Sequence, residues 1–278
     1  MTWFVVLLLL ACLAVLPLIL EARRRTIGKT ARKGASGKFV QLGRGVTHFE
    51  WGGPVRGPVA VLIHGLTTPS VVWNDIAAGL GNMGYRVLVY DLYGRGLSDA
   101  PTGAQDVGFF VDQLSELLAD QGVTDDLTLV GYSMGGAIAT AYAAENPHCI
   151  KRLILVATAC VAMHETRFTR FCRATPILGD WAHGMFARRR AAKAIPRVGP
   201  STMAGQVYAE QRIELRRRGF MPSILSSRRN MLFELQESDH RRLGRVDVPT
   251  IAIWAEHDQV IPIQALGILA QWHRDVRQ

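Results

Sequence analysis

Five short runs of apolar residues, rich in Val, Ile and Leu, recur along the chain, and longer stretches of helical pattern separate them. The apolar runs cover residues 59–63, 86–90, 127–130, 153–156 and 250–254. The helical patterns cover residues 71–82, 105–121, 133–145 and 262–272. A strand that is apolar on both sides must be covered on both faces, as happens in a parallel sheet flanked by helices. The pattern predicts an α/β fold with a mostly parallel, doubly wound sheet.

The regular alternation of strands and helices stops between about residues 159 and 245. This stretch is rich in arginine, with aromatic and methionine residues interspersed, and a structureless loop of such length is rare in a compact domain. We therefore expect a helical insert over residues 160–246. At 278 residues the chain is long enough for one large domain with an insert. The core would then comprise residues 39–159 and 247–278.

The N-terminus carries an uninterrupted apolar run over residues 3–20, which begins with Trp3 and is followed by Arg23, Arg24 and Arg25. A helix of this length just crosses a hydrocarbon layer of about 30 Å. We expect a transmembrane anchor at 3–20 and a basic juxtamembrane linker at 21–38, which places the following domain on the cytoplasmic side. A cleaved signal peptide is the alternative, although its basic start and small-residue cleavage site are not clear here.

The net charge of +9 is concentrated in two regions of the chain. Residues 21–45 carry a local charge of +7 and residues 160–246 a local charge of +10, so the remaining residues are net acidic. No recognition motif accompanies this charge, so nucleic acid is not an expected partner. Two basic regions around an acidic core favour an anionic membrane surface. Solvated arginines on surface helices explain the second region equally well.

The cysteines and short motifs give no sign of a cofactor. Cys12, Cys149, Cys160 and Cys172 show no paired spacing, so neither a disulfide framework nor a zinc site is expected, and a reducing compartment fits best. The chain also lacks a phosphate loop and a dinucleotide fingerprint. We predict no metal and no bound cofactor.

A glycine-flanked serine lies between the third apolar run and a helical pattern, in the sequence Gly131-Tyr132-Ser133-Met134-Gly135. A nucleophilic serine on such a strand–turn–helix needs strained backbone angles, and therefore small neighbours. The N-terminus of the following helix also favours negative charge that develops beside it. Ser133 is thus the candidate nucleophile. An ordinary helix-capping serine in a glycine-rich turn is the alternative.

Three further motifs accompany this serine in a recognisable order. They are His64-Gly65-Leu66 after the first apolar run, residues 91–99 (DLYGRGLSD) after the second, and residues 254–262 (WAEHDQVIP) after the last. Together with the Ser133 turn they resemble the α/β-hydrolase superfamily over about residues 59–272. The resemblance implies the α/β-hydrolase fold, with the insert as a helical cap and the N-terminal transmembrane helix ahead of it.

The resemblance also implies roles for individual residues. Ser133 corresponds to the nucleophile and Asp258 to the acid that orients the catalytic histidine. The backbone N–H groups of Leu66 and Met134 correspond to the oxyanion hole. His64 corresponds to a residue that supports its loop.

The same motifs contain three other carboxylates, which the resemblance does not make the first choice for catalysis. Asp91 and Asp99 correspond to residues that stabilise turns and loops, with catalysis as the alternative. Glu256 is the alternative to Asp258 as the acid.

The catalytic base is where the chain departs from the family pattern. The order in this fold is serine, acid, histidine, and His273 is the only histidine after Asp258. It falls at the end of the helical pattern at 262–272, whereas the family's base follows one further strand. We therefore expect that the sequence lacks its last strand, base and closing helix. Substitution of the base by His273 is the alternative.

These residues favour acyl transfer to water through an acyl-enzyme on Ser133. A serine at this turn argues against haloalkane dehalogenases and epoxide hydrolases, whose nucleophile is an aspartate. The membrane helix and the apolar, basic insert favour a lipid or lysolipid ester as substrate. A catalytically impaired, membrane-tethered binding domain is the alternative, and a perhydrolase or haloperoxidase-like side activity fits the same turn. Nothing in the sequence predicts an oligomeric state.

Overall fold

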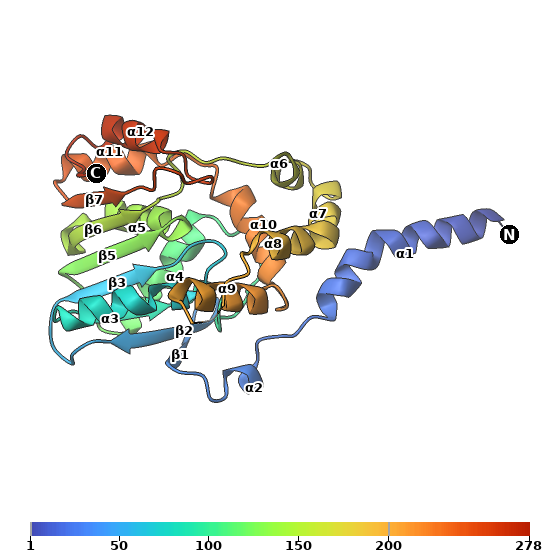
Figure 1. Cartoon of the computed structure of the whole chain (residues 1–278), viewed down its shortest axis with the longest axis horizontal. Coiled ribbons are helices and arrows are strands. Elements are labelled where there is room, and N and C mark those ends of the chain that lie inside the picture. Colours follow the sequence, from blue (N-terminus) through green and yellow to red (C-terminus); the bar gives the residue numbers. More distant parts are fainter. Residues whose placement is uncertain (1, 200) are drawn as a thin grey trace.

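The computed structural model describes residues 2–199 and 201–278 and is built around one sheet (Figure 1). Its seven strands lie in the order β1-β2-β4-β3-β5-β6-β7. The strands are β1 (Lys38–Leu42), β2 (Gly45–Gly52), β3 (Val59–Ile63), β4 (Arg86–Tyr90), β5 (Leu127–Tyr132), β6 (Ile150–Val156) and β7 (Thr250–Ile253). From β4 to β7 all neighbouring strands pair in parallel. The predicted α/β fold with a mostly parallel sheet is confirmed.

The first two strands were not predicted from the sequence. β1 and β2 form an antiparallel hairpin, and β2 also pairs antiparallel with β4. Their sequences, KFVQL and GVTHFEWG, mix polar and apolar residues, because an edge hairpin of a sheet need not be apolar on both faces. The expected linker over residues 21–38 therefore ends where β1 begins.

Helices follow most of the strands and also form the insert. They are α1 (Thr2–Ala22), α2 (Lys29–Arg32), α3 (Asn74–Asn82), α4 (Val107–Asp120), α5 (Met134–Glu145), α6 (Arg167–Ala174), α7 (Leu178–Ala182), α8 (Arg188–Ala194), α9 (Met203–Glu214), α10 (Phe220–Asn230), α11 (Glu237–Arg245) and α12 (Gln264–Trp272). Shorter turns are η1 (Ser70–Trp73), η2 (Pro147–Cys149) and the π-helical η3 (His183–Ala187).

The sheet is covered on both faces, as the alternation along β3 shows. Ala60 and Leu62 pack in one apolar cluster with Trp73 of η1. Val61 and Ile63, which point to the opposite face, belong to the main core with residues of α4 and α5. Because successive side chains of a strand point to opposite faces, this division explains why the strand is apolar throughout.

The chain between β6 and β7 divides into two groups of helices. The helices α6 to α10, with η3, lie together beyond the sheet and form what we call the cap (Figure 1). The last helix of this stretch, α11, instead packs against α5 and α12 in the layer that covers the sheet. By packing, therefore, the cap ends before α11, whereas the boundary expected from composition lies at residue 246.

The N-terminal helix α1 extends away from the rest of the molecule (Figure 1). It has 21 residues and a mean hydropathy of 3.0 in its most apolar window. Pro17 is its only buried side chain among the described residues. Its length and composition suit a membrane span, and a signal sequence would have the same properties.

The edge strand β7 is partly exposed to solvent. In β7 the side chains of Ile251 and Ile253 are 40% and 51% exposed. Arg277 adds a single parallel bridge beside this strand. In that bridge the Ala252 N–H donates to the Arg277 carbonyl at 2.8 Å, and the Arg277 N–H donates to the Thr250 carbonyl at 3.0 Å.

Candidate active site

Ser133 lies on a strained turn between β5 and α5. Its backbone has φ 53° and ψ −116°, a region that costs a residue other than glycine about 1–3 kcal/mol. Hydrogen bonds hold this geometry, since the Ser133 N–H donates to the Val156 carbonyl at 2.9 Å and the Ser133 carbonyl accepts from the Gly136 N–H at 2.9 Å. The Ser133 side chain makes no capping hydrogen bond to α5. These features match a nucleophile elbow better than a helix-capping serine.

The glycines around the elbow are required by close packing. A Cβ atom at Gly131 would clash with the Gly135 carbonyl, and one at Gly135 would clash with the Ile63 carbonyl. A Cβ atom at Gly65 would lie 3.3 Å from Cβ of Ser133. The loop of residues 64–66 therefore lies directly against the nucleophile.

The two predicted oxyanion donors, Leu66 and Met134, directly follow Gly65 and Ser133, the two residues that make this contact. Leu66 lines the same cavity as Ser133. Met134 is the first residue of α5, so its N–H has no partner within that helix. Their assignment to the oxyanion hole stays a prediction.

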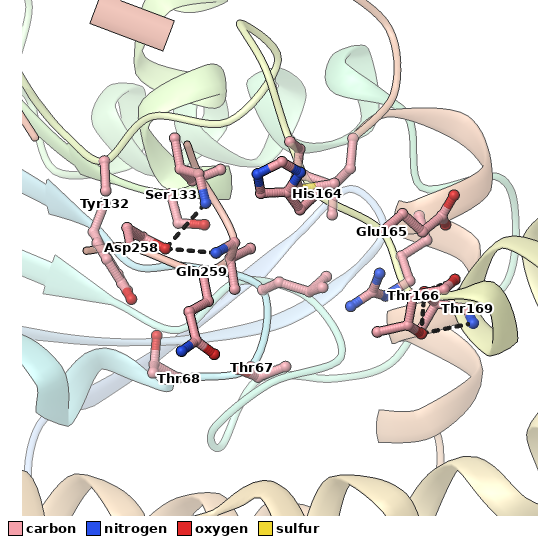
Figure 2. A pocket seen from close by; sticks show the side chains of 17 residues that line it. Thr67, Thr68, Tyr132, Ser133, His164, Glu165, Thr166, Thr169, Asp258 and Gln259 are labelled. Carbon is pink, nitrogen blue, oxygen red and sulfur yellow. Dashed lines mark hydrogen bonds between the residues drawn. The ribbon is translucent and has the colours of Figure 1, made fainter. Parts of the chain in front are cut away.

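A cavity of about 400 Å³ opens beside Ser133 (Figure 2). Its walls come from the loops that follow β3, β5, β6 and β7, and from two cap helices. The residues that line it include Leu66, Thr67, Tyr132, Ser133, His164, Thr166, Thr169, Arg228 and Asp258. The carboxyl ends of the parallel strands therefore converge on one hollow, as is general for open α/β sheets.

Asp258 reaches this cavity from the loop after β7. Its Oδ1 accepts hydrogen bonds from the N–H groups of Val260 at 2.7 Å and Ile261 at 3.0 Å, which orient the carboxylate (Figure 2). Asp258, Tyr132 and Ser133 line the same cavity. Burial raises the pKa of Tyr132, and the negative charge of Asp258 raises it further. Glu256, the alternative acid, is exposed and does not line the cavity.

The structure places a histidine in the cavity that the sequence reasoning missed. His164 is the only histidine that lines it among the described residues, and the backbone N–H of His164 donates to the Val260 carbonyl at 2.7 Å. It was overlooked because it precedes Asp258 in the chain, whereas the family order places the base after the acid. Its position shortly after β6, at the carboxyl edge of the sheet, was the available signal.

His273 is not brought to the cavity. Its side chain is 2% exposed and lies at the end of α12, where a Cβ atom at Gly244 of α11 would be 3.1 Å from its Cδ2. Burial lowers the pKa of His273. It does not line the Ser133 cavity, so the structure argues against its substituting for the base.

His64 supports its loop, as the resemblance implies. Its Nδ1–H donates to the Gly65 carbonyl at 2.8 Å, and its Nε2 accepts from the Leu92 N–H at 2.9 Å. Burial lowers the pKa of His64 to about 4, so the ring is neutral at pH 7. Because both ring nitrogens are engaged, His64 holds the loop and is not free to act as a base.

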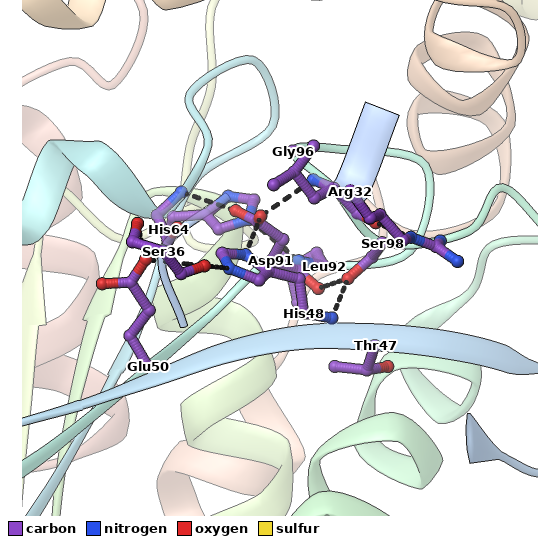
Figure 3. A network of polar contacts seen from close by, with 12 residues as sticks. Arg32, Ser36, Thr47, His48, Glu50, His64, Asp91, Leu92, Gly96 and Ser98 are labelled. Carbon is purple, nitrogen blue, oxygen red and sulfur yellow. Dashed lines mark hydrogen bonds and ion pairs between the residues drawn. The ribbon is translucent and has the colours of Figure 1, made fainter. Parts of the chain in front are cut away.

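Asp91 is the centre of a buried polar network behind this loop (Figure 3). Its Oδ1 accepts from the Ser70 N–H at 2.9 Å, and its Oδ2 accepts from the Leu97 N–H at 2.9 Å and from Nδ1 of His48 at 2.7 Å. His48 Nε2 donates to the Ser36 carbonyl at 2.8 Å. Both nitrogens of His48 therefore face acceptors, which favours the doubly protonated ring.

The ionic state of this pair follows from these contacts. Burial alone would raise the pKa of Asp91, but the hydrogen bond and charge of His48 outweigh it and hold that pKa at about 2. Burial opposes the charge of His48 as well, and Asp91 outweighs it and raises the pKa of His48. Asp99 has a similar structural role, since it accepts from the Val46 N–H at 2.8 Å and pairs with Arg32 at 2.7 Å. Neither aspartate lines the cavity.

Arg95, in the same loop as Asp91, is a positioning residue that the sequence reasoning did not single out. Its side chain is fully buried. Its Nε donates to the Leu66 carbonyl at 3.2 Å, and its Nη2 donates to Oγ of Ser227 in α10 at 2.8 Å. Its Nη1 donates to Oε1 of Gln105 at 2.8 Å. Arg95 thus connects the predicted oxyanion loop to the cap.

A second, larger cavity of about 700 Å³ lies among the cap helices. It shares Thr67, Thr166, Thr169 and Arg228 with the Ser133 cavity. The rest of its wall is mainly apolar and includes Ala187, Ala191, Ile195, Leu215, Phe220, Met221 and Ile224. Over the described part of the chain, no group of three His, Cys, Asp or Glu side chains could hold a metal ion.

A family profile and the sequences of known proteins match this chain. The profile of the family described as alpha/beta hydrolase fold matches residues 58–278. Lipase 3 of a Moraxella species is 28% identical over 221 residues, which cover 78% of this chain and 68% of the lipase. An uncharacterised protein of Mycobacterium tuberculosis is 36% identical over 100 residues, and the match spans only 29% of that protein.

Among solved structures, a membrane phospholipase A, described as a bacterial virulence factor, superposes with a TM-score of 0.67. It is 23% identical, and the match covers 99% of this chain and 89% of the phospholipase. At this level of identity the likeness concerns the fold alone.

The buried pair of Asp91 and His48 predicts a defined pH dependence of stability. The pKa of Asp91 falls from its ordinary value of 3.8 to about 2, so its contribution is present above about pH 4 and is lost as the pH falls through 2. The pKa of His48 is raised above its ordinary 6.5, so its contribution is complete below pH 6.5 and is lost as the pH rises through the raised value. Together the pair stabilises most between about pH 4 and 6.5.

We therefore expect Asp91→Asn to lower the free energy of unfolding by roughly 2 kcal/mol near pH 5, and by less near pH 3. Urea denaturation of the chain in detergent micelles, followed by circular dichroism at both pH values, measures this difference. Asp125→Asn, at an exposed carboxylate, is the control. An equal loss at both pH values would contradict the assignment.

Proposed function

The chain belongs to the α/β-hydrolase fold family, and we propose that within it the protein hydrolyses carboxylic esters through an acyl-enzyme formed on Ser133. The observation that carries the proposal is the strained backbone of Ser133 at the mouth of a cavity that Asp258 also lines. Strain of this kind is retained where the surrounding structure requires it, and it is common at active sites. The similarity to Lipase 3 of a Moraxella species agrees with this reaction class.

The proposed reaction uses groups already positioned around the cavity. Oγ of Ser133 attacks the ester carbonyl, and the N–H groups of Leu66 and Met134 bind the resulting oxyanion. A base takes the Oγ proton and passes it to the alcohol as the ester C–O bond breaks. The same base then takes a proton from the water that attacks the acyl-enzyme and returns it to Oγ as the acid is released. Each backbone donor of such a site typically contributes a factor of about 100 or more to turnover.

The base that activates Ser133 determines how fast this chain works. His164 is the imidazole that lines the cavity, and we assign it as the candidate base. No hydrogen bond joins the Ser133 side chain to an imidazole among residues 2–199 and 201–278. This observation favours a second candidate function, a membrane-tethered domain that binds a ligand in the same cavity without turnover.

The cap cavity favours a lipid or lysolipid ester as the substrate. It is mainly apolar and continuous in its lining with the Ser133 cavity, so an acyl chain could extend from the scissile carbonyl into the cap. Arg228 lines both cavities, where its charge suits an anionic part of the substrate. The membrane phospholipase A with the same fold aligns with 99% of this chain, a share that must include most of α1.

We further propose that α1 anchors the protein in a membrane as a single span, with the hydrolase domain on the cytoplasmic side. The basic residues that follow α1 support this orientation. The small-molecule or lipid ester would then reach the cavity from the adjacent leaflet.

Labelling with a fluorophosphonate probe tests the nucleophile. We expect the full chain in micelles to be labelled, and Ser133→Ala to be unlabelled and to lose essentially all hydrolysis of p-nitrophenyl butyrate. His164→Ala should keep its fold but lower kcat about 100-fold or more, because general base catalysis contributes 100- to 10,000-fold. His273→Ala, at a buried position outside the cavity, should leave kcat nearly unchanged in the folded fraction.

The same measurements separate the two candidate functions. If Ser133 is not labelled in the folded chain and no ester is hydrolysed, the binding-domain function replaces the enzymatic one. If Ser133→Ala retains hydrolysis, the nucleophile is assigned wrongly.

A compartment reporter fused to the C-terminus tests the orientation. Because the basic flank of a span stays in the cytoplasm, alkaline phosphatase fused there should be inactive and a fluorescent protein should be bright. Active phosphatase would instead place the domain on the opposite side.

The acyl preference should depend on the free volume of the cap cavity. Ala191→Phe fills part of that cavity, so kcat/KM for p-nitrophenyl palmitate should fall about tenfold or more relative to p-nitrophenyl butyrate, since each methylene that loses its buried site costs about 0.8 kcal/mol. Ala78→Phe, at an exposed position of α3, is the matched control. An unchanged ratio in Ala191→Phe would show that the acyl chain binds elsewhere.

A further inference from the structure

The helix α1 is not a free tether, because its second half packs against the cap. Nε1 of Trp181 in α7 donates to the Leu13 carbonyl at 2.8 Å. A Cβ atom at Gly184 of η3 would lie 2.7 Å from Cβ of Pro17, so the two backbones approach closely. Further along, the Gly219 N–H donates to Oε1 of Glu21 at 2.7 Å. The anchor and the cap therefore meet over about two turns of helix.

A hollow of about 380 Å³ lies in this junction, and half of the eight residues that line it are arginines. The arginines line it together with apolar residues from both the anchor and the cap. The arginines are Arg24, Arg188, Arg189 and Arg216, and the apolar side chains are Leu20, Met185 and Phe186. We call this hollow the arginine pocket. It is distinct from the Ser133 cavity and shares no lining residue with it.

The positive charge of the arginine pocket is largely uncompensated. Arg24 pairs with Glu21 at 2.7 Å, and this is the one ion pair of the four arginines among the described residues. Burial lowers the pKa of Arg24 and Glu21 raises it, while the positive charge of Arg188 lowers it further. Arg24 and Arg188 line the same hollow. Like charges brought together in one hollow repel unless an anion joins them.

The cap elements that contact the anchor, α7 with its N-cap residue and η3, expose large apolar side chains. Ile177, Leu178 and Phe186 are 80%, 65% and 45% exposed. Leu13 accepts the hydrogen bond from Trp181. Along the axis of α1, Leu13 lies about 10 Å before Leu20, the last apolar residue of the run, because a helix rises 1.5 Å per residue. With α1 in a membrane, these side chains reach the interfacial layer, where exposed apolar groups and Trp are stable.

We propose that the arginine pocket binds the phosphate of an anionic phospholipid headgroup at the membrane surface. This inference rests on the proposed membrane anchoring, and it does not require that the protein hydrolyse the bound lipid. Guanidinium groups bind phosphate oxygens through paired N–H donors. Leu20, Met185 and Phe186 provide the apolar wall that the adjoining acyl chains need, and basic pockets beside membrane helices bind lipid headgroups in this way.

Native mass spectrometry of the full chain tests the proposal. The protein, with Ser133→Ala to prevent turnover, is released from micelles that contain equimolar dioleoyl phosphatidylglycerol and dioleoyl phosphatidylcholine. We expect phosphatidylglycerol adducts to exceed phosphatidylcholine adducts about tenfold. Arg188→Glu combined with Arg189→Glu should abolish the preference. Equal retention of the two lipids, or an unchanged preference in the double variant, overturns the proposal.

Two further arms make the result specific. Arg56→Glu combined with Arg274→Glu changes the net charge equally at exposed positions outside the arginine pocket, and it should keep the preference. An excess of inorganic phosphate should displace little phosphatidylglycerol, and full displacement would assign the pocket to soluble phosphate and overturn the lipid assignment. Ester hydrolysis is measured separately on the chain with Ser133 intact, so a lipid preference without hydrolysis contradicts the proposed enzyme and leaves the arginine pocket standing.

Discussion

The buried guanidinium group of Arg95 connects the loop beside Ser133 to the cap, two parts of the molecule whose relative position shapes the candidate site. Burial lowers the pKa of Arg95 to about 9, against the opposing charge of Glu214, so the group remains charged at pH 7. Its donors are used on the carbonyl of Leu66 and on the side chains of Gln105 and Ser227. A buried donor that loses its hydrogen-bond partner typically costs about 1–3 kcal/mol, and more when the donor is charged. The cap and the loop beside Ser133 therefore cannot shift independently at little cost.

The part of the candidate site that could be predicted from the sequence depends on tight backbone geometry. Strained turns and close backbone contacts demand particular residue types at fixed spacing, so Ser133 with Gly131 and Gly135 was visible in the sequence. The strands at 59–63 and 86–90 were equally visible, because burial on both faces leaves uninterrupted apolar runs. Asp258 lines the same cavity as Ser133, and it was visible as the candidate acid because its loop carries a motif directly after β7. These features all depend on residues that are near one another in the chain.

What the sequence did not reveal depends on contacts between distant segments. The hairpin of β1 and β2 is mixed in polarity, and its pairing with β4 depends on tertiary contacts. His164 reaches the cavity because the loop after β6 bonds to the loop after β7, through the Val260 carbonyl. Two partners of Arg95, Leu66 and Ser227, lie 29 and 132 residues away from it. No periodicity or local motif encodes such distances. The helical insert was predicted, but its contacts with the core and its cavities emerged only from the three-dimensional arrangement.

The packing of α1 against α7 and η3 has a mechanical consequence. In a lipase whose lid is free, the body of the enzyme is the fixed reference and the lid swings. Here the bond from Trp181 to Leu13 and the contact of Gly184 with Pro17 fasten the cap to the anchor. With α1 in the proposed membrane span, these contacts would hold the cap in a fixed orientation to the bilayer. Because Arg95 couples the cap to the loop beside Ser133, the orientation of the Ser133 cavity relative to the bilayer surface would be fixed as well.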